Sequence, residues 1–249
     1  MRQLGAVIDV DGRAQRIAGA KVEATITRSV DGIASDVSMT LYALPDEVVQ
    51  SVLAGKAVKA QVLVDDEIAT TFDMVTADYK AASHALVIRG GEAALLYNEA
   101  RVSLAFQKAA PVVEVVRGVA SAVGLPVIMP NAPAVKSDQR VFSCLWRDAM
   151  TRLLGDGWTV TASGVVIGGV ASSVNLTPRN VHQWTGWSRS RTRDGKDRRV
   201  LSCIAPYTPV DVGAECGYDN GYMSGKGAVW SLTHSLSDAE QVTKLQILT

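Results

Sequence analysis

Apolar and polar side chains alternate with a period of two through much of the first hundred residues. Within residues 21–26, Val22, Ala24 and Ile26 fall on one face, and residues 37–41 repeat the pattern. A strand that packs one face on a core requires this alternation. Further strand candidates lie at 59–64, 68–75 and 84–88, with the acidic break 65–67 expected to be a solvated turn. Five or more short strands at this spacing predict a small antiparallel barrel or sandwich.

The middle of the chain changes to helical periodicity. Residues 111–124 place valines on one helical face, and residues 142–154 carry a stronger apolar stripe at helical spacing. A short buried strand is expected between them at 125–129. A hairpin is expected after them, formed by 158–161 and 165–167. This order predicts a small α+β unit of roughly sixty residues.

The last part of the chain returns to strands. Strand candidates are residues 181–188, 200–205, 229–234 and 241–248. Between them, residues 211–227 contain five glycines. This stretch is expected to be the most loop-like part of the chain.

Composition sets the class of protein. The 249 residues are 47% hydrophobic and 20% charged, which is typical of a soluble globular chain with about two domains. Lys+Arg and Asp+Glu both number 25, and this zero net charge argues against a bulk nucleic-acid binder. No apolar stretch approaches the ~18 residues of a membrane span, and no signal peptide is expected after Met1.

The residues that could carry chemistry form no recognisable motif. The histidines are His84, His182 and His234, and the cysteines are Cys144, Cys203 and Cys216. None has metal-ligand spacing, although together they leave a metal or iron–sulfur site open as an alternative. Cys216 lies in the glycine-rich stretch, which leaves an exposed position open for it. The odd, widely spaced cysteines favour a reducing compartment. We expect no catalytic residues, no cofactor and no metal, and so no enzyme.

Two features favour binding. Trp184 and Trp187 precede a basic run, and Tyr218 and Tyr222 lie in the glycine-rich stretch. The basic run comprises Arg189, Arg191, Arg193, Lys196, Arg198 and Arg199, opposed by Asp194 and Asp197. Aromatic and basic residues together can bind nucleic acid, but the Asp-Gly at 194–195 favours a hairpin. We interpret its arginines as docking groups for acidic residues of a partner protein. The expected protein interface contains Trp184, Trp187, Arg189, Arg191, Arg193, Arg198, Tyr218 and Tyr222.

The order of these elements resembles the phage late control gene D and Mu-type baseplate hub family. The resemblance rests on residues 53–58 before a strand, 85–91 at the end of the first strand-rich region, 112–125 and 146–158 in the α+β unit, and the closing strands 228–236 and 243–248. It implies a mainly β (α+β) fold with two tube-like antiparallel β-barrel domains, 1–107 and 172–249, and a small α+β domain, 108–171, between them. The chain is shorter than the family pattern and has Gly91 where the family often has Asp, and no appended lysozyme-like domain is expected.

The resemblance also implies a structural function. Family members form a homotrimer that joins the tail tube and distal tail proteins to the spike or tip, with DNA passing transiently through the channel. Such a subunit is assembled in the host cytoplasm and resides in the virion tail. Two other functions remain open: a secretion-channel or periplasmic adaptor built around 108–171, which would require export, and a tail-associated cell-wall hydrolase.

Overall fold

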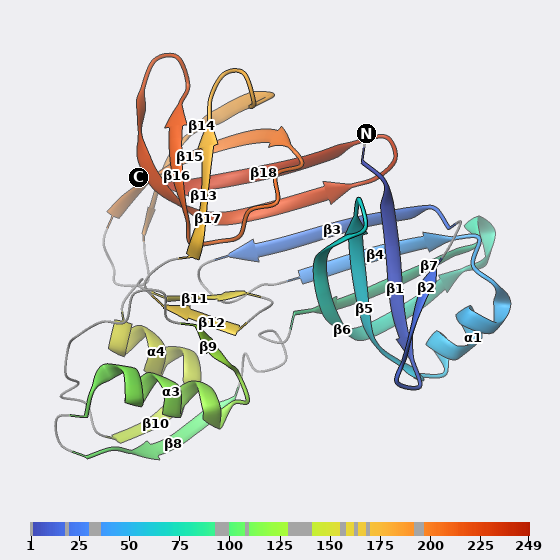
Figure 1. The fold of residues 1–249 in the computed structure, drawn as a ribbon, viewed down its shortest axis with the longest axis horizontal. Coiled ribbons are helices and arrows are strands. Elements are labelled where there is room, and N and C mark those ends of the chain that lie inside the picture. The colour runs from blue at the N-terminus through green and yellow to red at the C-terminus, as the bar shows by residue number, and fades with distance from the viewer. Residues whose placement is uncertain are drawn as a thin grey trace.

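The computed structural model describes residues 2–17, 20–29, 36–92, 100–107, 110–128, 141–154, 158–161, 164–167, 170–191 and 197–249. Its dominant element is a 13-stranded sheet in the order β14-β15-β18-β17-β3-β4-β7-β6-β5-β1-β2, with β16 joined to β17 and β13 joined to β16. The N-terminal part of this sheet lies to the right in Figure 1, the C-terminal part above on the left, and a helical unit below on the left.

Seven strands and one helix make up the N-terminal region. They are β1 (Leu4–Val10), β2 (Arg13–Ile17), β3 (Val22–Ser29), β4 (Asp36–Tyr42), α1 (Asp46–Leu53), β5 (Ala57–Val64), β6 (Glu67–Lys80) and β7 (Ala85–Gly91). The alternation predicted in β3 is confirmed, because Val22, Ala24 and Ile26 are all buried. They contribute to a first hydrophobic cluster, on which α1 also packs through Val52.

The turn between β5 and β6 shows how local chemistry sets the strand register. Asp65 and Asp66 both have positive φ, at 52° and 67°, and Val64 pairs with Glu67 across them. A two-residue turn with two left-handed positions matches the twist of the flanking strands, and Asp tolerates that conformation better than most residues. Both aspartates are exposed, so the predicted solvated turn is confirmed.

The middle unit has its own core. Its elements are β8 (Arg101–Ala105), α3 (Val112–Ala122), β9 (Val127–Ile128), β10 (Val141–Leu145), α4 (Trp146–Leu154), β11 (Trp158–Thr161) and β12 (Gly164–Ile167). The stripe predicted for the first helix is buried in α3, and α4 adds Trp146, whose ring meets Trp158 edge-on at 5.6 Å. The hairpin β11–β12 forms as predicted, and β9 pairs with β12 in parallel.

The second helix was predicted to begin too early. Residues 141–145 form β10, in which Phe142 and Cys144 are buried and Ser143 is exposed. Phe142 and Trp146 lie four residues apart, so a buried strand running directly into a buried helix imitates one continuous helical stripe. Because β10 pairs with β8, Val102 of β8 belongs to this second cluster. The division at 107, 171 and 172 remains a prediction.

Six strands make up the C-terminal region. They are β13 (Val170–Leu176), β14 (Gln183–Arg191), β15 (Asp197–Pro206), β16 (Ala214–Asp219), β17 (Ser224–Leu236) and β18 (Gln241–Leu248). A third hydrophobic cluster, with Leu201, Cys203, Val229 and Ile247 among its members, lies between them.

The expectation that 211–227 is a loop is wrong for most of that stretch. Glu215 to Asp219 pair with Ser224 to Ala228 in a regular antiparallel ladder. The glycines allow close packing: a Cβ on Gly227 would lie 2.3 Å from the carbonyl oxygen of Leu248. Glycine is required where another backbone approaches this closely.

One long strand joins the N-terminal and C-terminal regions. The first part of β17 pairs with β16, and its last part, Ser231 to Leu236, pairs with Ser29 to Ala24 of β3. In Figure 1, β3 extends from the N-terminal strands to lie along β17. Among the described residues the ladder ends at β14, β2 and β13 and closes no barrel. The mainly β fold is confirmed, and the two-barrel arrangement is not. No described helix is long and apolar enough to cross a membrane.

Candidate interaction surface and buried polar junction

The basic run forms the predicted hairpin. β14 pairs with β15 so that Arg189 lies opposite Arg199, and Arg191 lies opposite Asp197. Arg193 lies outside the described residues, as do the side chains of Arg191 and Arg198. Arg189 and Arg199 are both exposed. Two like charges placed directly opposite each other on neighbouring strands destabilise the pair.

A shallow depression lies beside these arginines. It has a volume of about 410 Å³ and is lined by Trp187, Ser188, Arg189, Arg199 and Met223. Trp187 is 41% exposed, and Met223 is 40% exposed. The structure therefore brings two predicted interface residues, Trp187 and Arg189, together with three others that border the same surface. We name this depression the hairpin surface.

The turn between β16 and β17 places Met223 at the hairpin surface. The side-chain oxygen of Asn220 accepts hydrogen bonds from the backbone amides of Tyr222 and Met223, at 3.0 and 2.8 Å. The Asp219 carboxylate accepts another from the amide of Gly221 at 2.9 Å. Asn and Asp commonly fix turns in this way. Tyr222, which precedes Met223, is 96% exposed.

The other two predicted interface residues face inward. Trp184 and Tyr218 are partly buried against the third cluster, and the Tyr218 hydroxyl lies 2.7 Å from where a Cβ on Gly225 would be. A bulge makes Thr185 an extra residue in β14, so Trp184 pairs with Cys203 and Trp187 with Leu201. Trp184, Trp187 and Arg189 therefore share the core-facing side of the sheet. Along β14, this side of the strand packs on the third cluster at Trp184 and then lines the hairpin surface at Trp187 and Arg189.

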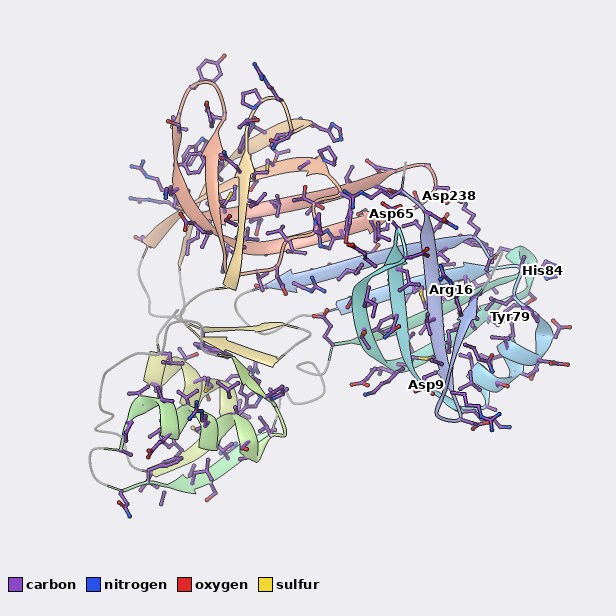
Figure 2. All side chains as sticks on the ribbon, viewed as in Figure 1. Asp9, Arg16, Asp65, Tyr79, His84 and Asp238 are labelled. Atoms are coloured by element: carbon purple, nitrogen blue, oxygen red, sulfur yellow. The ribbon has the colours of Figure 1, made fainter. Side chains whose placement is uncertain are left out.

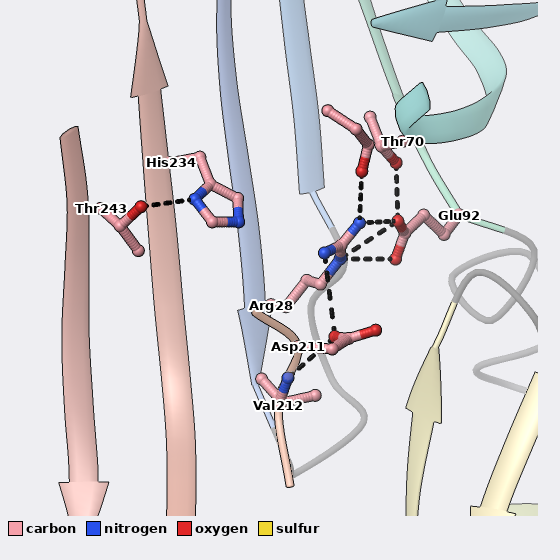
Figure 3. A network of polar contacts seen from close by, with 8 residues as sticks. Arg28, Thr70, Glu92, Asp211, Val212, His234 and Thr243 are labelled. Carbon is pink, nitrogen blue, oxygen red and sulfur yellow. Dashed lines mark hydrogen bonds and ion pairs between the residues drawn. The ribbon is translucent and has the colours of Figure 1, made fainter. Parts of the chain in front are cut away.

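A second cluster of polar groups is buried where the two parts of the sheet meet (Figure 3). Arg28 follows Ile26 on the inward face of β3, and its guanidinium donates to both carboxylate oxygens of Glu92 at 2.6–3.2 Å. Thr70 donates to Glu92 at 2.6 Å, and the carbonyl of Ala69 accepts from Arg28 at 3.2 Å. The Asp211 carboxylate lies 3.8 Å from Arg28. We name these residues the buried junction.

The electrostatics of the buried junction are those of a structural ion pair. Burial would lower the pKa of Arg28, but the charges of Glu92 and Asp211 outweigh it and raise that pKa. Burial also raises the pKa of Asp211, against the opposing effects of Arg28 and the Val212 amide. Glu92 is 1% exposed, so its carboxylate cannot reach a substrate. A buried charge must be paired and hydrogen-bonded, as these are.

His234 on β17 lies beside the buried junction. Its Nδ1 is 2.9 Å from the Thr243 hydroxyl, and its ring meets that of Tyr207 edge-on at 5.1 Å. Burial and the nearby charge of Arg28 lower the pKa of His234 to about 3. The imidazole is therefore neutral and serves as a hydrogen-bonding core group.

The remaining histidines and the cysteines form no shared site in the described part of the chain. His84 ends a short 3₁₀ turn, η1 (Ala81–Ser83), in a left-handed conformation and contacts the Tyr79 hydroxyl at 3.2 Å (Figure 2). It was expected within a strand, and β7 begins only after it. His182 is exposed. No group of three or more metal-ligating side chains occurs among the described residues.

All three cysteines are free and buried. The exposed position left open for Cys216 is excluded, because β16 buries it completely. Burial raises the pKa of Cys203 and of Cys216 to about 12, with the nearby Cys216 also contributing at Cys203. Thiols in this environment are unreactive core groups.

The fold is similar to that of phage tail proteins. The 43 kDa tail protein of prophage MuSo2 from Shewanella oneidensis superposes with a TM-score of 0.67 at 12% identity, covering 98% of this chain and 96% of that chain. The tail protein of Neisseria meningitidis gives 0.65 at 12% identity, covering 99% and 96%. A type VI secretion system component of E. coli, structurally similar to bacteriophage T4 tail proteins, gives 0.55 at 9% identity, covering 92% and 73%.

These similarities extend over nearly the whole chain and establish the fold. No family model matches the sequence. No curated protein matches it by sequence.

Proposed function

We propose that this chain is a structural hub subunit of a phage tail or a related contractile injection system. Three copies would form a ring that joins the tail tube and distal tail proteins to the spike or tip, as the baseplate hub resemblance implies. The observation that carries the proposal is the similarity to two tail proteins over at least 98% of this chain and 96% of each of theirs. Such coverage includes both strand-rich regions and the helical unit, rather than one common module.

The internal arrangement supports a rigid ring component. The two strand-rich regions are joined by the pairing of β17 with β3, and the Arg28–Asp211 ion pair, at 3.8 Å, links them as well. We propose that they correspond to two tube-like domains, 1–107 and 172–249, with 108–171 between them. Six such domains in a trimer would match a hexameric tail tube, and DNA would pass through the channel. The assembled subunit would reside in the virion tail.

Native mass spectrometry of the purified protein tests the ring. The monomer has a mass of 26.4 kDa, and we expect a species of three copies that persists at micromolar concentration. Probing purified particles with an antibody against the chain tests its location, and we expect signal from the tail. A strictly monomeric protein that is absent from particles would refute the proposal.

The hairpin arginines test docking within the assembled tail. Replacement of Arg191, Arg193 and Arg198 by serine should leave the isolated subunit folded, because surface substitutions change stability little. Assembly of tails should fail or become sensitive to salt, since each lost arginine removes a charge-assisted contact. Normal infectious tails from the triple variant would contradict a docking role for these arginines.

A further inference from the structure

β14 ends the sheet and has one free edge. Among the described residues it pairs with β15 alone. The carbonyl of Arg199 accepts a hydrogen bond from the amide of Thr249 at 3.0 Å, so the backbone of Arg199 faces β18. Residues opposite each other in an antiparallel pair either bond each other or both turn away. Arg189, which lies opposite Arg199, therefore turns its N–H and C=O outward to the free edge.

The outward-facing groups form a short ladder. Backbone direction repeats at every second residue of a strand, so Trp187 also turns its N–H and C=O outward, whereas Ser188 bonds to β15. Natural proteins commonly blunt such an edge with proline, bulges or charged side chains. β14 contains no proline, and its bulge lies at Trp184–Gly186, before this ladder. The charged residues of this edge, Arg189 and Arg191, are both positive, so they repel a basic strand but not an acidic one.

The side chains next to the ladder favour an anion. Arg189 and Arg199 form a pair without hydrogen bonds between their backbones, the geometry in which opposite side chains come closest. Neither side chain has a hydrogen bond or an ion pair to another described residue. A carboxylate between the two guanidinium groups would accept hydrogen bonds from both and remove their repulsion.

The hairpin surface adds the apolar part of an interface. Exposed Trp187 and Met223 line it, with Tyr222 next to it in the chain. Trp, Tyr, Met and Arg are the residues enriched at the centres of protein interfaces. The surface therefore combines a backbone ladder, two arginines whose side chains have no partner among the described residues, and apolar contact area.

We propose that an extended acidic segment of a partner protein adds to the edge of β14 as a further strand. Its backbone would pair with Trp187 and Arg189, a carboxylate would bridge Arg189 and Arg199, and an apolar side chain would enter the hairpin surface. Charge selects an acidic segment, because 189–199 contains six basic and two acidic residues. The backbone ladder selects a peptide over nucleic acid, since strand addition requires main-chain amides and carbonyls. Under the proposed function this partner is another tail protein.

Amide hydrogen exchange measured by NMR on the isolated full-length chain tests strand addition. The probe is a short peptide in which glutamate alternates with valine, and the control peptide has lysine in place of glutamate. We expect the glutamate peptide to slow exchange of the Trp187 and Arg189 amides by at least about tenfold, because new hydrogen bonds protect them. The Ser188 amide, already bonded to β15, should change little. The lysine peptide should protect none of them.

Charge reversal tests the arginine pair. The double variant Arg189→Glu/Arg199→Glu should weaken binding of the glutamate peptide by at least about tenfold and gain affinity for the lysine peptide. Arg13→Glu reverses an exposed arginine on β2, the strand at another end of the sheet, and is the matched control that keeps wild-type binding.

Three outcomes would overturn the proposal: unprotected Trp187 and Arg189 amides at saturating glutamate peptide, equal binding by the double variant, or protection by oligothymidylate in place of the peptide. The last would assign the surface to nucleic acid. Peptide binding by a chain that is monomeric and absent from particles would refute the trimeric hub and leave strand addition standing. A trimeric tail protein that does not bind the peptide would support the hub and refute strand addition.

Discussion

Arg28 on β3 and Arg189 on β14 each lie next to buried or half-buried residues on the core-facing side of their strand. One is buried and paired with an acid, whereas the other is exposed. Arg28 follows Ile26 on β3, is 7% exposed, and is bonded to Glu92. Arg189 follows Trp187 on β14, is exposed, and faces Arg199 rather than an acid. Other segments of the same chain supply the partners of Arg28, whereas Arg189 borders the hairpin surface. The difference separates a charge that serves the fold from charges available to a partner.

Removing the acid of the buried junction should have the largest effect. Glu92→Ala leaves Arg28 buried without its main counter-charge, and we expect a loss of about 3–5 kcal/mol in the free energy of unfolding. Urea denaturation measures it. Arg28→Met combined with Glu92→Leu should recover much of this loss, because an apolar pair leaves no buried charge. A loss below about 1 kcal/mol in Glu92→Ala would show that the junction is hydrated.

Acid should destabilise the region of the buried junction through His234. Its pKa is about 3 in the folded state and ordinarily 6.5, so in between the unfolded chain binds a proton that the folded chain does not. Its contribution to stability is complete above pH 6.5 and is lost as the pH falls toward about 3, by up to about 1.4 kcal/mol per pH unit. The raised pKa of Asp211 has the opposite effect on stability. As the pH falls, the folded state takes up a proton at Asp211 more readily than the unfolded chain, and this uptake stabilises the folded state.

Urea denaturation at a series of pH values between about 4.5 and 7.5 measures this slope. His234→Gln keeps a polar side chain near Thr243 and cannot titrate, so we expect a flatter dependence. His182→Gln, at an exposed position, is the matched control. An unchanged slope in His234→Gln would assign the acid sensitivity to other groups.

The two tryptophans of β14 should separate stability from binding. Trp184→Ala removes a ring packed on the third cluster, and we expect a loss of about 2 kcal/mol, below the range for fully buried tryptophan. Trp187→Ala should cost less than about 1 kcal/mol and should weaken binding of the glutamate peptide. Thermal unfolding and peptide titration on both variants check this. Equal effects of the two substitutions on stability would mean that the hairpin surface belongs to the core.

The smallest expected effect is a gain in stability. Arg189→Ser removes one of two opposed like charges, and we expect the free energy of unfolding to rise by a few tenths of a kcal/mol. The gain should shrink at high salt, because exposed charges are screened. Paired urea titrations at low and high salt check it, with Arg13→Ser as the control for loss of an exposed arginine. Destabilisation by Arg189→Ser would show that this arginine has a stabilising partner within the chain.

Local patterns predicted local structure well. The alternation of Val22, Ala24 and Ile26 identified β3, and the Asp-Gly at 194–195 identified the β14–β15 hairpin. The pattern failed where one element runs directly into another, as β10 does into α4. It also failed at 211–227, because glycines that permit close backbone packing have the same composition as a loop.

Sites assembled from distant segments were beyond sequence patterns. Arg28 lies at the next inward position after Ile26, which is a signal for a buried charge. Its partner Glu92 lies 64 residues away, and no local pattern connects them. The hairpin surface was predicted in part: Trp187 and Arg189 lie on it. Trp184, which the bulge in β14 places on the same side of the sheet, packs instead on the third cluster.

The pairing of β3 with β17 also sets an order of events during synthesis. Ser29 pairs with Ser231, so about 200 residues must leave the ribosome before β3 acquires this neighbour. Until then β3 pairs with β4 while its other edge is open, and Arg28 lacks the nearby charge of Asp211. Contacts so distant in sequence form late and slowly, and an uncovered strand edge invites association with other chains. Chaperone binding to the nascent chain should therefore be strongest before the last strands emerge, and premature termination before residue 224 should yield aggregation-prone fragments.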